Sequence, residues 1–302
     1  MLIYPRMNIK LKRYFASSAV IFLCVSLCHA STVGIIITPE GIVMGADGRA
    51  RGGSTPCNTE TSSTMQKVFL LRHRFLLGGV LLGGAKSEDG SGRFYNLPAL
   101  AHAVESKIHR HTTVQEFFQI VEDESTKELA FVTNDIDKWT CGLKGQPTTK
   151  DGGTLVQFLM AGFEAGVPLA YHLDFKIDRE KHTATPVRAP IPACTLQQID
   201  CRPQLFGLYF GIFKFCSAES RGREKLGSKF QFMCGPVWPS IKNLKQASDI
   251  MRLRIEIESN IEPGFVNFPI TIITLPAHGR GSRKRYKNAP SSEDFPAYVQ
   301  QY

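Results

Sequence analysis

The boundary between Ala30 and Ser31 constrains this 302-residue chain more than any other point in its sequence. Residues 1–30 begin with a basic stretch that contains no acidic residue, and an apolar run from Tyr14 to Leu27 follows. This order, ending in small residues before the cut, is typical of a secretory signal peptide that is removed during export. The sequence therefore predicts an exported chain that begins at Ser31. An uncleaved N-terminal anchor and a cytosolic propeptide are the alternatives.

A β-hairpin is predicted directly after this boundary. Val33 to Thr38 is rich in β-branched residues, and Pro39-Glu40-Gly41 forms a turn in which glycine can take a positive φ. Ile42 to Ala46 is the second strand, and the segment Asp47-Gly48-Arg49-Ala50 follows it. Residues 31–46 therefore supply the first two strands of an antiparallel sheet.

The remaining pattern alternates strands and helices. Further strands are predicted at 67–71, 75–82, 153–163, 169–177 and 267–275, and helices at 96–109, 114–125 and 241–258, while 51–64 reads as a Gly/Ser/Thr-rich loop. This order indicates an α+β protein with two packed antiparallel sheets and helices on their outer faces. The predicted organisation is a signal peptide at 1–30, one domain at 31–276 and a basic, disordered tail at 277–302.

Charge excludes some classes of partner. Removing residues 1–30 takes away four positive charges and lowers the formal net charge from +9 to +5. Much of the remaining excess lies in the predicted tail, so the domain itself is close to neutral. This distribution argues against a nucleic-acid partner, which needs a basic face on the folded domain. The apolar run is too short for a comfortable membrane span, so no stable membrane insertion is expected after cleavage.

Cysteine usage is compatible with export but leaves the pairing open. Six of the eight cysteines remain after signal removal, and six cysteines allow fifteen disulfide pairings. Free buried thiols are the alternative. No CxxC pattern or Cys/His spacing typical of a metal site occurs, so neither a metal nor another cofactor is predicted.

The segment from Ser31 to Ala50 resembles the N-terminus of a mature proteasome β subunit, a family of N-terminal nucleophile (Ntn) hydrolases. In that family a nucleophilic first residue opens a hairpin that ends in Gly-Ala-Asp-x-Arg-Ala, and Gly45 to Ala50 has that form here. Met65 to Phe69 resembles the strand with the active-site lysine, and Gly83-Gly84 resembles the following glycine pair. The resemblance covers about residues 31–85 and implies a four-layer αββα sandwich.

The resemblance implies a catalytic role for Ser31, Asp47, Lys67, Arg49 and Gly83. A serine hydroxyl needs a nearby base, and a free α-amine on the same residue can serve because its pKa is near 8. A lysine charge would keep that amine unprotonated, and Asp47 would hold Lys67 in place. Arg49 would extend this charge network. A glycine at position 83 would let a backbone N–H approach the oxyanion.

Each of these residues also has an ordinary structural interpretation. Ser31 can simply be the first residue after a signal cut, and Asp47 can cap a turn. Lys67 can be a strand-edge lysine, and Gly83-Gly84 can form a bulge or strand end. Cleavage one residue later would make Thr32 the nucleophile, but its spacing to Asp47 would then be one residue short.

These observations predict an exported hydrolase that cleaves peptide or other amide bonds through an acyl-Ser31 intermediate, in the secreted, periplasmic or ER-lumenal space. The sequence is compatible with a homo-oligomer and with a hetero-oligomer. One rival is a catalytically silent relative used for binding, because residues 261–269 lack the Asp, Ser and Gly-Gly that the family carries before its last strand. The other is a cytoplasmic subunit whose residues 1–30 are a propeptide.

Overall fold

The computed structural model describes ten segments of the chain. They are residues 32–52, 61–82, 84–86, 93–134, 153–178, 180–192, 204–207, 241, 243–261 and 268–287. Ser31, Gly83 and all six cysteines of the predicted mature chain lie outside these segments. The predictions of a signal peptide and of disulfides therefore concern residues that the structure does not describe.

The first sheet is antiparallel and contains the predicted N-terminal hairpin. Its strand order is β12-β1-β2-β13-β14. The bounds are β1 Thr32–Thr38, β2 Gly41–Ala46, β12 Gln204–Gly207, β13 Ile270–Pro276 and β14 Ser282–Tyr286. β1 and β2 are buried along their whole length, so the hairpin lies inside the protein rather than at its rim.

The second sheet is also antiparallel and has the strand order β11-β10-β9-β6-β5. Its strands are β5 Val68–Leu71, β6 Phe75–Val80, β9 Thr154–Glu164, β10 Val167–Asp178 and β11 Thr183–Pro190. Two short ribbons complete the strands: β3 Arg49–Gly52 with β4 Thr61–Thr64, and β7 Gly84–Lys86 with β8 Phe94–Asn96.

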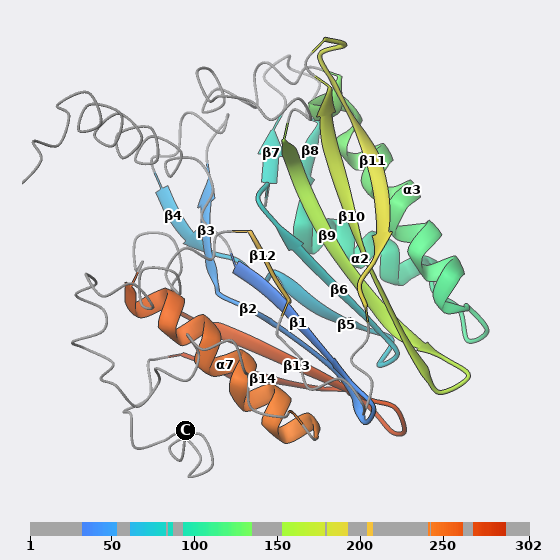
Figure 1. Cartoon of the computed structure of the whole chain (residues 1–302). Helices are drawn as coiled ribbons and strands as arrows, with labels where there is room; N and C mark the ends of the chain where they lie inside the picture. Colours follow the sequence, from blue (N-terminus) through green and yellow to red (C-terminus); the bar gives the residue numbers. More distant parts are fainter. Residues whose placement is uncertain are drawn as a thin grey trace, which may run out of the picture.

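Helix α7, Leu244–Ile261, packs on β1, β2 and β13 of the first sheet (Figure 1). The close approach depends on Gly45 in β2, because a Cβ there would lie 2.5 Å from Met251 and 2.7 Å from Ile272. Glu40, in the tip of the β1–β2 hairpin, accepts a hydrogen bond from the N–H of Leu244 at 3.1 Å. The hairpin therefore fixes both the face and the beginning of this helix.

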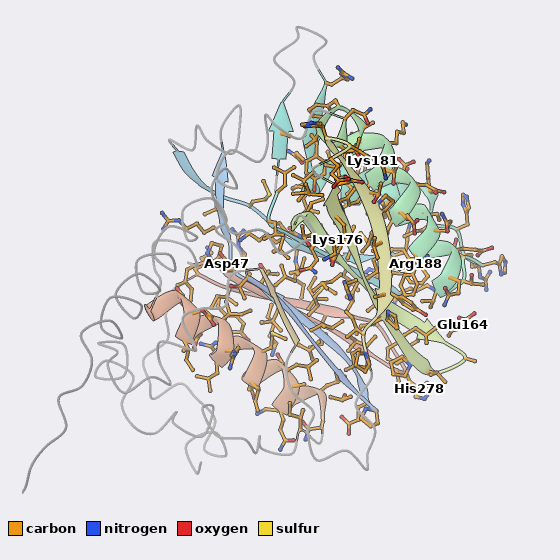
Figure 2. All side chains as sticks on the ribbon, turned by 45° about the horizontal axis from the view of Figure 1, so that its top comes forward. Asp47, Glu164, Lys176, Lys181, Arg188 and His278 are labelled. Atoms are coloured by element: carbon orange, nitrogen blue, oxygen red, sulfur yellow. The ribbon has the colours of Figure 1, made fainter. Side chains whose placement is uncertain are left out.

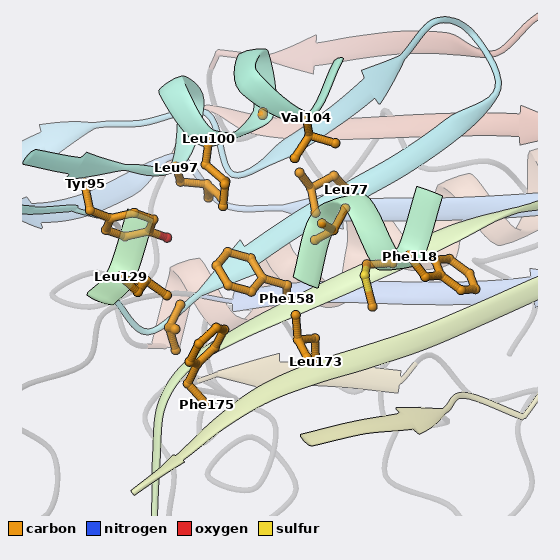
Figure 3. Packing of buried hydrophobic residues seen from close by; sticks show 14 of the residues in the cluster. Leu77, Tyr95, Leu97, Leu100, Val104, Phe118, Leu129, Phe158, Leu173 and Phe175 are labelled. Atoms are coloured by element: carbon orange, nitrogen blue, oxygen red, sulfur yellow. The ribbon is translucent and has the colours of Figure 1, made fainter. Parts of the chain in front are cut away.

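Helices α2, Leu97–Lys107, and α3, Val114–Thr133, cover the second sheet. Thr113 and Glu116 form a capping box, which satisfies two backbone donors at the beginning of α3. The core between these helices and the sheet is rich in leucine and aromatic side chains (Figure 3), including Leu77, Tyr95, Leu97, Leu100, Phe118, Phe158, Leu173 and Phe175. None of the helices in the described segments is long and apolar enough to cross a membrane.

The two sheets share a second apolar core. Val33, Ile35 and Met44 of the first sheet pack in one cluster with side chains of the second sheet, among them Val68, Leu76, Leu159 and Ala161. The N-terminal hairpin thus contributes to the contact between the sheets as well as to the surface under α7.

The structure confirms the prediction of two antiparallel sheets with helices packed on them, but several of its short strands were not predicted. β3 and β4 lie at the ends of the segment expected to be a loop, and β11 lies in a region without clear periodicity. Strand β14 lies in the predicted disordered tail, and that expectation is wrong for Ser282–Tyr286, which pair with β13. Its Ser-Arg-Lys-Arg-Tyr sequence is almost fully exposed, so it shows no apolar alternation.

A polar cluster interrupts the inner face of the second sheet. Asp174 is only 3% exposed, and its carboxylate accepts hydrogen bonds from Gln157 at 2.5 Å and Lys176 at 2.9 Å, while His172 Nδ1 lies 3.1 Å away. Burial alone would raise the pKa of Asp174, but the hydrogen bonds of Lys176, His172 and Gln157 outweigh it and lower the pKa. The carboxylate is therefore held in its charged form.

We predict that Asp174→Asn destabilises the protein in a pH-dependent way. A carboxyl whose pKa is lower in the folded state contributes stability above its unfolded value, near 3.8, and loses it as pH falls through the folded value. The variant should cost about 1–3 kcal/mol at neutral pH, measured by urea unfolding, and the difference should shrink below pH 4. Asp123→Asn, on the exposed face of α3, is the control and should change little. A difference between Asp174→Asn and the native chain that is constant with pH would contradict the prediction.

Candidate functional site

The register of the first hairpin places Asp47 opposite Thr32. Thr38 pairs with Gly41 across a two-residue turn, and the ladder continues to Val33 opposite Ala46. The next backbone groups also meet, because the N–H of Asp47 donates to the carbonyl of Thr32 at 3.3 Å. In return, the N–H of Thr32 donates to Asp47 Oδ1 at 2.8 Å. The carboxylate therefore closes the end of the hairpin.

Asp47 and Lys67 form a buried ion pair. Lys67 Nζ lies 2.7 Å from Asp47 Oδ1, and the two residues are only 3% and 1% exposed. The other carboxylate oxygen, Oδ2, accepts the backbone N–H of Arg49 at 2.9 Å. Asp47 thus accepts hydrogen bonds from β1, from the residue at the beginning of β3 and from the residue before β5. Figure 2 shows Asp47 far from Glu164, the last residue of β9, and from His278, in the loop between β13 and β14.

Backbone contacts hold the two charged residues in place. Gly48 accepts a hydrogen bond from the N–H of Met65 at 2.8 Å, and Lys67 accepts one from the N–H of Gly79 at 2.9 Å. A Cβ at position 48 would lie 2.6 Å from the carbonyl oxygen of Pro269, so only glycine fits between Asp47 and Arg49 without a shift of the backbone. Pro269, in the segment before β13, therefore packs closely against Gly48, on the side chain-free face of the turn that also binds Met65.

Burial sets the protonation behaviour of Lys67. Removal from water lowers the pKa of its ammonium group, and the nearby charge of Arg49 lowers it further. Asp47 opposes this change through its charge and its hydrogen bond, but the net shift of the Lys67 pKa is downward. A buried lysine with a lowered pKa beside a carboxylate is a typical feature of functional sites, although structural ion pairs also show it.

The structure brings together three of the five predicted site residues. Asp47, Lys67 and Arg49 are neighbours, whereas Ser31 and Gly83 lie outside the described segments, one residue before β1 and one before β7. Within the described part of the chain, no group of three or more His, Cys, Asp and Glu residues could hold a metal ion.

The backbone N–H of Thr32 is the part of the site that the sequence did not predict. Thr32 was considered only as a rival nucleophile. The sequence predicts a turn at Pro39-Glu40-Gly41, which would shift the pairing by one residue, but Gly41 is the first residue of β2. A two-residue turn places Thr32 opposite Asp47, so the length of this turn was the signal that could have identified the contact.

Comparisons with known proteins do not assign the chain to a family. No protein-family model and no curated protein match it. Solved structures with a similar course of the chain include an Anbu mutant from Hyphomicrobium sp. strain MC1, at 14% identity over 90% of this chain and 93% of that one. A helical Anbu assembly from Pseudomonas aeruginosa has 15% identity, with coverages of 89% and 91%. Anbu (ancestral beta-subunit) from Yersinia bercovieri has 13% identity, with coverages of 89% and 92%. The TM-score is 0.45 in each case.

The assignment to the proteasome β-subunit family is therefore wrong. No family model supports it, and the similar structures named above are Anbu proteins at 15% identity or less. The physical reason is that the resemblance covers only one hairpin and two short strands, about 55 residues. Residues 261–269 lack the Asp, Ser and Gly-Gly that the family carries before its last strand.

We predict that Asp47 and Lys67 are strongly coupled in stability. Breaking a buried ion pair leaves an uncompensated charge, so Lys67→Met and Asp47→Asn should each cost about 3–5 kcal/mol. The double variant removes both charges and should cost at least about 1 kcal/mol less than the sum of the single changes. Unfolding of the four proteins in urea measures this cycle. Additive losses would show that the two side chains do not depend on each other.

Proposed function

We propose that this chain is an exported hydrolase that cleaves peptide or other amide bonds with Ser31 as its N-terminal nucleophile. The observation that carries the proposal is the buried Asp47–Lys67 pair beside the N–H of Thr32. Ser31 is joined to Thr32 by one peptide bond, so a mature chain that begins there would start next to this pair. A buried lysine with a lowered pKa beside a carboxylate is typical of functional sites, which supports the proposal.

The chemistry needs only groups of this chain. The neutral α-amine of Ser31 takes the hydroxyl proton while Oγ attacks the carbonyl carbon of the substrate. The C–N bond then breaks, the leaving amine receives that proton, and an acyl-Ser31 ester forms. Water attacks the ester with the α-amine again as base, which releases the acid and restores Ser31. Lys67 favours the neutral amine by its charge, and Asp47 holds Lys67 in position.

Gly83 and Arg49 have supporting roles in the proposed reaction and carry no separate chemical step. The backbone N–H of Gly83 stabilises the oxyanion in the proposal, and Arg49 contributes its charge close to Lys67. We further propose that the fold is a four-layer αββα sandwich, which is supported by α7 on the first sheet and α2 and α3 on the second. Export, and assembly into an oligomer of the kind named for the Anbu complex of Pseudomonas aeruginosa, stay predictions for this chain.

N-terminal sequencing of the mature protein is the decisive first experiment. The proposal requires a chain that begins at Ser31, recovered from the exported fraction. An intact Met1, or a beginning at any other residue, would remove the free α-amine from the predicted position. Recovery of the protein only from the cytosol would overturn the proposed export independently of the cleavage position.

Substitution of the nucleophile then tests the reaction. Ser31→Ala should lower amide hydrolysis by about a thousandfold or more, whereas Ser31→Thr keeps a hydroxyl and should retain measurable activity. The rate of the native protein should rise with pH through the α-amine pKa, because only the neutral amine is a base, and the Lys67 charge should place that pKa below the ordinary value, near 8. Both variants must first be shown to begin at residue 31. Full activity of Ser31→Ala would exclude Ser31 as the nucleophile.

A further inference from the structure

A groove lies along the β5 edge of the second sheet, on the opposite side of β5 from β6, where no other described strand pairs with it. It has a volume of about 460 Å³, within the range of pockets that bind ligands. Its walls come from three elements: β5 with the adjoining residues, α2, and the β13–β14 hairpin. Its lining includes Gln66, Leu70, His73, Ala101, His102, Glu105 and Arg283.

The backbone of β5 offers hydrogen-bonding groups to this groove. The N–H of Gly79 donates to the carbonyl of Lys67, so Lys67 directs its backbone groups toward β6. In an antiparallel pair this direction alternates from one residue to the next. Val68 and Leu70 therefore direct their N–H and C=O groups away from β6, and among the described strands β5 is the last on that side of the sheet.

One of these outward groups already has a side-chain partner. The carbonyl of Val68 accepts a hydrogen bond from Gln66 Nε2 at 2.9 Å, which confirms the direction deduced for this residue. Arg283 Nη1 donates to Gln66 Oε1 at 3.2 Å and so orients the amide. Leu70, which lines the groove, directs its N–H and C=O outward two residues further along the same edge.

The side chains of the groove combine an apolar floor with a rim of nitrogen donors. Leu70 and Ala101 belong to the floor, whereas His73, His102 and Arg283 are exposed. Glu105 is the acidic residue of the lining, and its carboxylate accepts the backbone N–H of Arg72 at 3.0 Å. The guanidinium of Arg283 and the ring N–H donors of the two histidines therefore favour a carboxylate on the occupant of the groove.

We propose that this groove binds an extended peptide segment that carries acidic side chains, by adding it as a strand beside β5. The outward N–H and C=O of Leu70 would pair with the peptide backbone, and the rim with its carboxylates. A peptide fits better than an isolated small acid because the free strand edge recognises a backbone, not only a charge. This interaction does not rest on the proposed hydrolysis and needs no step at Ser31.

The probe is the blocked hexapeptide acetyl-Val-Glu-Val-Glu-Val-Glu-amide with a fluorescent label. Binding is measured by fluorescence anisotropy with the full mature protein and with Ser31→Ala, so that cleavage and binding are separated. The same peptide with Gln in place of Glu should bind about tenfold more weakly, as loss of one charge-assisted contact predicts. No binding of the Glu peptide to either protein at millimolar concentration would overturn the proposal.

Backbone methylation of the probe tests strand addition directly. Two isomers carry N-methyl groups on either the three Val or the three Glu residues, so each blocks one edge of the extended peptide. One isomer should lose binding by about tenfold or more while the other keeps it, because only one edge faces β5. Equal binding of both isomers and the parent peptide would exclude pairing through the backbone.

Substitutions on β14 locate the probe. Arg283 and Lys284 are adjacent, exposed and of equal charge, but only Arg283 lines the groove, and Lys284 pairs with Ile272 on the α7 side. Arg283→Glu should weaken binding by about tenfold, and the matched control Lys284→Glu by less than about twofold. Equal effects of the two changes would reduce the interaction to general charge attraction and overturn the proposed site. Thermal unfolding of both variants verifies that the fold is intact.

Discussion

The Asp47 carboxylate is the interaction on which the candidate site depends. It accepts hydrogen bonds from the N–H of Thr32, from the N–H of Arg49 and from the ammonium of Lys67. Burying one charge without partners would be very unfavourable, and here each donor comes from a different part of the chain. The same three bonds therefore fix the end of the first hairpin, the beginning of β3 and the approach of β5. The Asp47 carboxylate therefore both stabilises the fold at this point and positions Lys67 for the proposed reaction.

Two glycines allow the chain to pack around that carboxylate. Gly45 lets α7 approach β2, and Gly48 lets the segment before β13 approach the turn that follows β2. Both positions would clash with a Cβ at less than 3 Å from backbone or core atoms. The Gly-Ala-Asp-Gly sequence is therefore required by packing on both sides of the hairpin. Such packing needs can arise in unrelated proteins, which explains why the motif alone did not identify a family.

The elements of this site that local pattern determines were predictable from the sequence. The hairpin, β5, β6, α2 and α7 all have apolar periodicity or β-branched runs. The Asp47–Lys67 contact was expected only from the resemblance of residues 31–85 to proteasome β subunits. What escaped prediction depends on long-range packing. The one-residue shift in the turn decided which residue faces Asp47. β14 forms because β13 offers it an edge, since three of its own five residues are basic and it has no apolar alternation. The polar cluster around Asp174 also breaks the alternation that identifies a strand facing a core.

The dipeptide Gln66-Lys67 connects the candidate site with the groove. Lys67 directs its carbonyl to Gly79 and its ammonium to Asp47, in the interior of the protein. Gln66 directs its amide to the carbonyl of Val68 and to Arg283, at the edge of the sheet. Because adjacent residues of an extended chain face opposite sides, one short segment can serve an interior ion pair and an exterior surface. A strand added at β5 would therefore contact the residue next to Lys67 without entering the buried pair. The groove can thus bind a partner while the geometry of Asp47 and Lys67 stays unchanged.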